Sequence, residues 1–364
     1  MAKQPVTFMI IGGGWRAEFY IRIAAALPDF FRITGMFVRD AEKGARLENK
    51  YNVRTYRTMD ELLAHASGSF AVLSVPRTVS PDFMSELAVR GIPVLAETPP
   101  AADLEALLAL YRKLPEGARI QVAEQYAFQP KHAARLAFAR SGKLGDLWHA
   151  QVSAAHDYHG VSLIRQLLGV GFEDAVIQGS RFGSRILKGP SRQGPPAAEE
   201  FVDQLQDIAA FRFEESGKSA VYDFTREQYF SWIRSGRVLV RGSRGEIADD
   251  RIRYMSDYAT PVYSELQRID AGHDGNLEGY HHVGILAGER WLYRNPFAPA
   301  RLSDEELAMA AVLQAMGDYA QGGPSFYSFA EAAQDQYLAI MMREAIERGT
   351  AVRTVRQPWA PPSP

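Results

Sequence analysis

The chain has 364 residues, of which 46% are hydrophobic, and a formal net charge of −2 at pH 7. This length predicts two domains, and the balanced charge gives no reason to expect a nucleic acid or a membrane surface as a partner. The sequence contains no cysteine, which excludes disulfides, a thiolate nucleophile and cysteine-ligated metals. It begins without the charged and apolar segments of an export signal, and it has no apolar stretch long enough to cross a bilayer. We therefore expect a cytoplasmic enzyme or binding protein.

The first motif is an apolar run at residues 6–11, followed by Gly-x-Gly-x-x-Ala at residues 12–17 and then by an amphipathic segment. This order predicts a buried strand, a tight turn and a helix, the arrangement that binds the pyrophosphate of a dinucleotide. Gly12 allows the turn, Gly14 lets backbone N–H groups approach the phosphate oxygens, and Ala17 keeps the helix close to the strand. The residues predicted to hold the pyrophosphate at the positive end of this helix are Gly12, Gly14, Trp15, Arg16 and Ala17.

A second apolar run at residues 31–38 predicts the next strand, and it favours a nucleotide site over an ordinary glycine-rich loop. Arg39 and Asp40 follow this run, close to the position that reads the adenosine ribose. An acidic residue there binds the 2′-hydroxyl of NAD, whereas an arginine favours the 2′-phosphate of NADP. Both residues are present, so the sequence leaves NAD and NADP open. A solvated pair at a strand end is the other interpretation.

Strand and helix patterns alternate as far as residue 123, which predicts an α/β Rossmann domain with a doubly wound parallel sheet. After about residue 129, long alternating stretches indicate an α+β domain with a large, mainly antiparallel and open-faced sheet. Helices are predicted at residues 303–319, where Ser303 and Glu306 have capping-box spacing, and at 329–348. The predicted domains are residues 1–127, for dinucleotide binding, and 128–350, for substrate binding and oligomerisation, with a proline-rich tail at 351–364.

The segment 178–199 is rich in glycine, proline, serine and arginine, so we expect a surface loop. In the simpler interpretation its basic side chains are solvated, and in the other they receive an anionic group of a substrate by charge-assisted hydrogen bonds. These basic side chains are Arg181, Arg185, Lys188 and Arg192.

Histidine and aspartate side chains cluster at residues 156–159 and again at 273–282. Such groups can ligate metals, but their spacings match no metal-binding helix motif and the two clusters lie far apart in sequence, so we expect no metal. The second cluster is expected in a loop or at a sheet edge over the substrate pocket. Its members are His273, Asp274, Tyr280, His281 and His282.

Four further segments, taken with the glycine turn, resemble the Gfo/Idh/MocA family of NAD(P)-dependent sugar and polyol oxidoreductases. They are Ser74-Val75-Pro76 at a strand end, residues 92–99, residues 141–145 and residues 159–169. The resemblance covers nearly the whole chain. It implies NAD or NADP as cofactor, a small carbohydrate-like substrate, and a homodimer or homotetramer formed through the open face of the second sheet. The residues that it places beside the nicotinamide are Val75, Pro76, Glu97, Thr98 and Gln125.

The sequence departs from this family at its catalytic positions. The family's Glu-Lys-Pro motif is Glu-Thr-Pro here, so Thr98 replaces the lysine that supports deprotonation of the substrate hydroxyl. The usual aspartates four residues before and three residues after the family's histidine are Ala155 and Ser162. The histidine itself is matched by His159, and imidazole is the side chain best suited to proton transfer at neutral pH. The predicted catalytic residues are His159 as general acid or base, with His156 and Asp157 in place of the missing groups unless these two face solvent.

Three functions agree with these residues. The leading one is NAD(P)-dependent hydride transfer to or from a sugar-like or polyol CH–OH or ketone. Loss of the lysine is also compatible with a redox-neutral glycosidase, lyase or isomerase, which oxidises a sugar carbon transiently and then returns the hydride. The third is a non-catalytic sensor that keeps only the nucleotide site.

Overall fold

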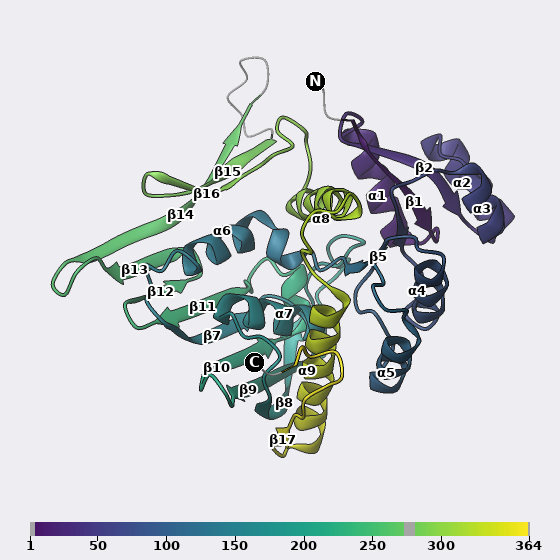
Figure 1. Ribbon diagram of the computed structural model, residues 1–364. Coiled ribbons are helices and arrows are strands. Elements are labelled where there is room, and N and C mark those ends of the chain that lie inside the picture. Colours follow the sequence, from purple (N-terminus) through teal and green to yellow (C-terminus); the bar gives the residue numbers. More distant parts are fainter. Residues whose placement is uncertain (1–3, 273–280, 363–364) are drawn as a thin grey trace. The chain divides into compact units, whose positions relative to one another are not determined.

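The computed structural model describes residues 4–272 and 281–362 (Figure 1). The chain forms two compact units. The first contains the described residues within 1–130, 269–284 and 294–333, and the second contains those within 131–268, 285–293 and 334–364. Within the described ranges, no helix combines the length and the apolar character that a membrane span requires.

A six-stranded sheet organises the first unit, in the order β3-β2-β1-β4-β5-β6, and all its strand pairs are parallel. Its strands are β1 (Val6–Ile11), β2 (Phe31–Phe37), β3 (Thr55–Tyr56), β4 (Phe70–Leu73), β5 (Val94–Ala96) and β6 (Ile120–Val122). The connecting helices are α1 (Trp15–Ala26), α2 (Ala41–Tyr51), α3 (Met59–His65), α4 (Ser80–Val89) and α5 (Leu104–Lys113). Strands β1 and β4 are apolar and almost wholly buried because helices cover both faces of such a sheet. The predicted doubly wound parallel sheet is confirmed.

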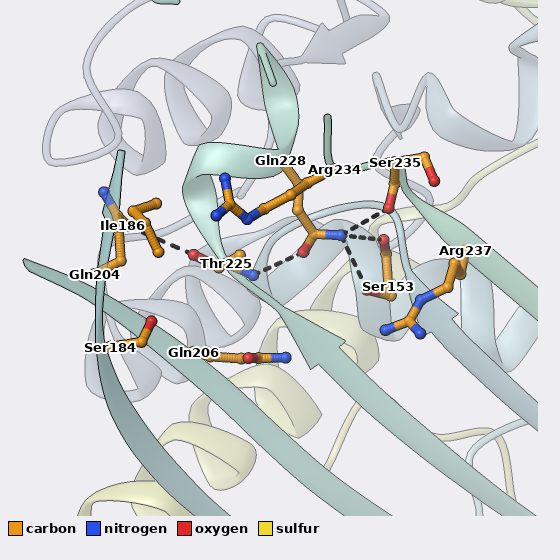
Figure 2. A pocket seen from close by; sticks show the side chains of 10 residues that line it. All are labelled: Ser153, Ser184, Ile186, Gln204, Gln206, Thr225, Gln228, Arg234, Ser235 and Arg237. Atoms are coloured by element: carbon orange, nitrogen blue, oxygen red, sulfur yellow. Dashed lines mark hydrogen bonds between the residues drawn. The ribbon is translucent and has the colours of Figure 1, made fainter. Parts of the chain in front are cut away.

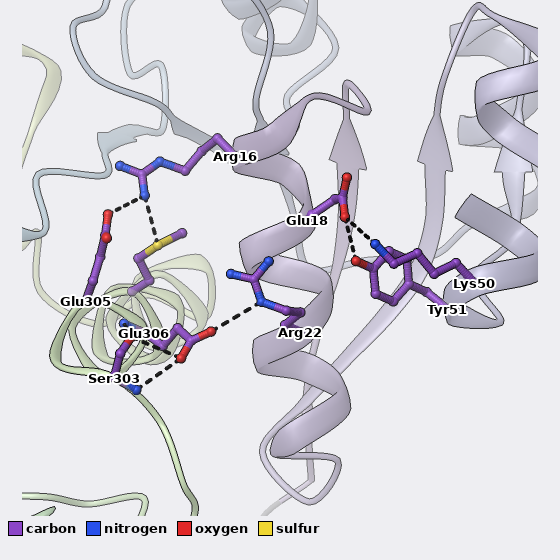
Figure 3. A network of polar contacts seen from close by, with 9 residues as sticks. Arg16, Glu18, Arg22, Lys50, Tyr51, Ser303, Glu305 and Glu306 are labelled. Carbon is purple, nitrogen blue, oxygen red and sulfur yellow. Dashed lines mark hydrogen bonds and ion pairs between the residues drawn. The ribbon is translucent and has the colours of Figure 1, made fainter. Parts of the chain in front are cut away.

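Helix α8 (Asp304–Ala320) belongs to the first unit, far along the chain from the strands that it covers. Its N-terminus has the predicted capping box, in which the Ser303 hydroxyl accepts from the backbone N–H of Glu306 and the Glu306 carboxylate accepts from that of Ser303. Its apolar residues join the core built by β1 and α1. A Cβ atom at Gly317 would lie 2.7 Å from the Val6 side chain, so this close approach requires glycine. Arg22 of α1 pairs with Glu306 at 3.3 Å (Figure 3).

An eleven-stranded sheet has the order β16-β15-β14-β13-β12-β11-β7-β10-β9-β8-β17. Strands β7 and β10 pair in parallel, and the pairs β10–β9, β9–β8, β7–β11, β11–β12, β12–β13 and β13–β14 are antiparallel. The strands are β7 (Leu147–Ser153), β8 (Ala175–Leu187), β9 (Phe201–Phe213), β10 (Ser219–Phe224), β11 (Arg237–Gly242), β12 (Gly245–Ala248), β13 (Arg251–Met255), β14 (Pro261–Ala271), β15 (His281–Ala287), β16 (Arg290–Arg294) and β17 (Val352–Arg353). The predicted large, mainly antiparallel sheet is therefore confirmed.

Three helices accompany this sheet, namely α6 (Pro130–Ala139), α7 (Asp157–Leu168) and α9 (Phe329–Arg348). Helix α7 packs on β7 and β10, where a Cβ at Gly160 would lie 2.6 Å from the Tyr222 ring. Helix α9 approaches β8 closely at Gly179, because a Cβ there would lie 2.5 Å from Ile346. In the C-terminal tail, β17 pairs with β8, and the buried Trp359 donates to the Gln334 side chain at 3.0 Å.

The expectation of a surface loop over residues 178–199 was wrong for its first half. Residues 175–187 form β8, which pairs with β9 along its whole length. Arg181 forms a two-point ion pair with Asp207 on the neighbouring strand, at 2.6 and 2.9 Å. Lys188 pairs with Glu200 at 2.5 Å. Arg181 and Lys188 are therefore each paired with an acidic side chain across this pair of strands.

Of the second histidine cluster, His273, Asp274 and Tyr280 lie outside the described residues. His281 and His282 begin β15, and His282 Nδ1 lies 2.9 Å from the Asp270 carboxylate. Among the described residues, no group of three or more His, Asp or Glu side chains is arranged to hold a metal ion.

Candidate active site

The glycine turn between β1 and α1 has the backbone shape that the sequence predicts. Gly12 has φ of +111°, and a Cβ there would lie 2.1 Å from the carbonyl oxygen of Ser74, so glycine is required. At Gly14, the N-cap of α1, a Cβ would meet no protein atom within 4 Å, and no side chain caps the helix. This helix end, with its positive dipole and open approach, fits the phosphate groups of a dinucleotide.

Arg16, in the first turn of α1, is braced by acidic side chains of the first unit. Its Nη1 donates to Glu305 of α8 at 2.7 Å (Figure 3), and its Nε lies 3.5 Å from Glu97. Tyr20 donates to Glu97 at 2.5 Å. With its amide oriented to satisfy both ends, Gln125 accepts from Arg16 Nη2 at 3.1 Å. The structure thus brings together three predicted cofactor residues, Arg16, Glu97 and Gln125.

The charges in this network reinforce one another. Burial by itself would lower the pKa of Arg16, but the neighbouring Glu97, Tyr20 and Glu305 raise it above the usual arginine value. Burial first, and then the Glu97 carboxylate, raises the pKa of Tyr20, so its hydroxyl keeps its proton and remains a donor. The cation beside the glycine turn is therefore already paired within the protein.

The predicted nicotinamide residues all follow parallel strands. Val75 and Pro76 come after β4, Glu97 and Thr98 after β5, and Gln125 after β6. Because β4, β5 and β6 are neighbours, these residues gather at the carboxyl edge of the sheet, where open α/β sheets bind their ligands. Thr98 is partly exposed.

At the other end of the predicted nucleotide site, Arg39 and Asp40 are both exposed just beyond β2. Asp40 is the N-cap of α2, and its Oδ1 accepts from the backbone N–H of Lys43 at 2.9 Å. One carboxylate oxygen is therefore engaged by the helix. The sequence alone does not reveal this capping role of Asp40.

The second unit carries the predicted catalytic histidine. His159 lies in the first turn of α7 and is only 7% exposed. Its ring packs edge-on against the ring of His156, with centroids 5.1 Å apart. It packs in the same way against the ring of Tyr158, with centroids 5.3 Å apart. The α7 segment therefore places both predicted histidines side by side.

His156 is the N-cap of α7 and contacts a residue that the sequence analysis missed. Its backbone N–H donates to the Tyr229 hydroxyl at 3.0 Å, and its Nδ1 contacts the same hydroxyl. Burial, followed by nearby His159, lowers the pKa of His156 to about 4, so this imidazole is neutral at pH 7. Tyr229 lies 73 residues further along the chain, and no motif links the two.

Asp157 begins α7 with φ of +35°, which is a strained conformation for a residue other than glycine. Its backbone N–H donates to the Tyr222 hydroxyl at 2.9 Å, and its carboxylate lies 3.7 Å from Arg343 of α9. Ala155 and Ser162 are both buried, and Ser162 accepts a hydrogen bond from Gln166 at 3.0 Å. Asp157 is thus the carboxylate nearest in sequence to His159 on this helix.

Comparison with known proteins identifies the N-terminal part of the chain. Residues 6–124 match the family model described as oxidoreductase family, NAD-binding Rossmann fold (Gfo/Idh/MocA). This domain belongs to the Gfo/Idh/MocA oxidoreductase family. The matched residues accordingly form the NAD-binding Rossmann domain of an oxidoreductase family. The resemblance inferred from the sequence motifs is confirmed, whereas the roles assigned to individual residues stay predictions.

Solved structures of several dehydrogenases and oxidoreductases share the fold over nearly the whole chain. A levoglucosan dehydrogenase in complex with NADH and levoglucosan is 15% identical, with a TM-score of 0.69 over 97% of this chain and 100% of that one. A myo-inositol dehydrogenase from Corynebacterium glutamicum is 18% identical, with a TM-score of 0.67 over the same shares. An oxidoreductase from Agrobacterium radiobacter, in complex with NAD+, L-tartaric acid and magnesium, is 15% identical, with a TM-score of 0.64 over 95% and 98%. No curated protein matches the sequence.

Proposed function

We propose that the chain transfers a hydride between NAD(P) and a sugar-like or polyol substrate, with His159 as general acid or base. The observation that carries this proposal is the buried His159 in the first turn of α7, next to a second imidazole. Support for the substrate class comes from the similar structures, which include an inositol dehydrogenase and a levoglucosan dehydrogenase.

The chemistry needs few groups. Bound NAD(P) would supply the acceptor for a hydride from the carbinol carbon, and the proton of the substrate hydroxyl must go to a protein base. Imidazole exchanges protons near neutral pH, so His159 takes that proton in oxidation and returns it in reduction. Thr98 has no amine to assist, and His156 and Asp157 are the polar groups of the α7 N-terminus left to position the substrate oxygen.

The test is a screen of sugars, polyols and sugar acids with NAD and NADP, read at the absorbance of reduced nicotinamide. Once a substrate is found, we expect His159→Ala to lower kcat by about 10²- to 10⁴-fold with NADH affinity unchanged. His149→Ala is the matched control, because His149 lies on β7 and binds Ser219 at 2.9 Å. Full activity of His159→Ala would remove His159 from the mechanism.

Thr98 favours a second candidate, a redox-neutral glycosidase, lyase or isomerase that returns the hydride within one turnover. The lysine that supports net oxidation in the family is a threonine here. Glycosides and sugar acids belong in the same screen, with products followed by chromatography. Product formed without a net change in nicotinamide absorbance would select this candidate over the dehydrogenase.

We also infer a homo-oligomer formed through the exposed part of the large sheet. Leu187 of β8 and Phe201 and Leu205 of β9 lie on one face of this strand pair and are 43–57% exposed, which is unusual for neighbouring large apolar side chains. A second copy of the chain would cover them. Light scattering coupled to size-exclusion chromatography should give at least twice the chain mass of 40.5 kDa, and a mass of one chain at micromolar concentration would contradict the inference.

A further inference from the structure

Tyr229 holds His156 through one hydroxyl group. The phenol oxygen accepts the backbone N–H of His156 at 3.0 Å and contacts Nδ1 of the same residue. The two rings are nearly perpendicular, with centroids 5.7 Å apart. A single side chain therefore fixes both the backbone and the ring of the residue that caps α7.

The segment that carries Tyr229 is itself anchored. It is the short 3₁₀ helix η2 (Arg226–Tyr229), which follows β10. Figure 2 shows Gln228 of this helix donating to the Ser153 carbonyl, the Ser153 hydroxyl and the Ser235 carbonyl, at 3.1–3.2 Å, while its amide oxygen accepts from the backbone N–H of Thr225. Ser153 ends β7, three residues before His156. The hydrogen bonds of Gln228 therefore link the segment after β10, which carries Tyr229, to the end of β7, which leads to His156.

The contact with the phenol favours one tautomer of His156. A tyrosine hydroxyl has one proton and two acceptor lone pairs, and the backbone N–H of His156 occupies one lone pair. A phenol O–H is more acidic than the N–H of a neutral imidazole and is the better donor, so the arrangement in which the hydroxyl donates to Nδ1 is favoured. In that arrangement Nδ1 is the acceptor and the ring carries its proton on Nε2.

The surroundings disfavour a second proton on this ring. The titratable and charged groups that face it are His159 and Asp157 on α7, Arg226 and Tyr229 on η2, and Arg343 on α9. Burial first, and then His159 and the two arginines, lowers the pKa of His156 to about 4, and the carboxylate of Asp157 lies 3.7 Å from Arg343. The imidazole therefore stays uncharged through the neutral range.

We propose that Tyr229 is a positioning residue that locks His156 as a neutral, Nε2–H donor imidazole beside His159, so that only His159 moves protons. The role of His159 in this division rests on the proposed function. The state of His156 does not, because it follows from contacts within the second unit.

The direct test is ¹⁵N NMR of the full chain labelled at histidine, with the His156 signals assigned from His156→Gln. In the wild type we expect the Nε2–H tautomer at pH 7 and no protonation of His156 above about pH 5. In Tyr229→Phe, loss of one hydrogen bond to the neutral ring should raise the titration midpoint by about one pH unit and mix the tautomers. A proton on Nδ1 of wild-type His156 at pH 7 would overturn the proposal without any variant.

Tyr222→Phe is the matched control. The Tyr222 hydroxyl also accepts a backbone N–H at the start of α7, that of Asp157 at 2.9 Å, but is not bonded to His156. The Tyr222→Phe variant should have a lower melting temperature than the wild type, and the tautomer and titration of His156 should be unchanged. If Tyr229→Phe behaves in the same way, Tyr229 is only structural and the proposal fails.

A kinetic measurement links this state to turnover. With an identified substrate, the acid limb of the kcat/KM profile of Tyr229→Phe should gain a second ionisation, whereas Tyr222→Phe should keep the wild-type profile. An unchanged profile in Tyr229→Phe would contradict the division of roles. The NMR result needs no substrate, so failure of this proposal and failure of the proposed function are separable.

Discussion

The two glycines of the nucleotide turn are needed for different reasons. Gly12 is required by the protein itself, since its φ is positive and a Cβ would overlap the Ser74 carbonyl. Gly14 is not required by the fold, because its backbone is extended and a Cβ would point into open space. The space above Gly14 is where the predicted pyrophosphate approaches.

This difference predicts separate outcomes for Gly12→Ala and Gly14→Ala. Gly12→Ala should destabilise the fold by about 3 kcal/mol or more, because backbone strain and a steric overlap add together. Gly14→Ala should change stability by no more than about 1 kcal/mol, yet weaken NADH binding at least about tenfold because the Cβ obstructs the phosphate. Urea unfolding and calorimetric titration with NADH measure the two effects. Wild-type NADH affinity in Gly14→Ala would place the pyrophosphate elsewhere.

At the scale of residues, the sequence predicts what depends on neighbours in the chain. The glycine turn and the two residues after β2 follow from local spacing. Arg16 was predicted as a pyrophosphate ligand, but its partner Glu305 lies 289 residues away, so no local pattern could show that the cation is already paired. Tyr229 was missed for the same reason.

A buried ion pair joins the helix that carries His159 to its neighbour α9. Arg165 of α7 lies 2.7 Å from Asp335 of α9, with side chains that are 3% and 1% exposed. Arg165 also donates to the carbonyl of Gly171, at 2.6 and 3.1 Å. Both charges are therefore almost completely shielded from water, so loss of one partner from the pair is strongly destabilising.

Removing one partner should be far more damaging than removing both. We expect Asp335→Ala to reduce the free energy of unfolding by about 3 to 5 kcal/mol, because it removes a carboxylate from a buried guanidinium. Arg165→Met combined with Asp335→Leu should recover most of that loss. Arg348→Ala, which breaks an exposed pair with Glu344, is the control and should cost less than about 1 kcal/mol. Equal losses in the single and double variants, measured by urea unfolding, would contradict this account.

At the scale of elements, periodicity predicts elements with one buried face. Strands β9, β10 and β11 and helices α8 and α9 were predicted from their patterns. Strand β8 was taken for a loop, because most of its residues beyond Gly179 are exposed and give no alternating apolar pattern. Only its pairing with β9, a long-range contact, makes it a strand.

Two histidines, the buried His132 and the partly buried His156, make the stability of the whole molecule sensitive to acid. Burial first, and then the adjacent Arg135, lowers the pKa of His132 on α6 to about 3, and the pKa of His156 is about 4. In the unfolded chain both titrate near pH 6.5. Between the folded and unfolded values, the unfolded state binds more protons, so stability falls as the pH drops below about 6.5.

We expect the free energy of unfolding to decrease steadily between about pH 6.5 and pH 4.5, by up to about 1.4 kcal/mol per pH unit for each histidine that stays neutral when folded. His132 is 8% exposed, so His132→Gln should remove close to the full contribution of one proton from this slope. Urea unfolding at half-unit pH intervals measures it. The same slope in wild type and variant would show that His132 does not stay neutral in the fold.

Helix α8 has a consequence for how the molecule is made. It covers the core of the first unit, yet it begins at Asp304, about 170 residues after the first stretch of that unit ends. At synthesis rates of 5–20 residues per second, the ribosome needs roughly 10 to 35 seconds to cover that interval. During this time the apolar side chains around Val6 and Phe8 are not yet covered by α8. We therefore expect the nascent Rossmann domain to bind a chaperone.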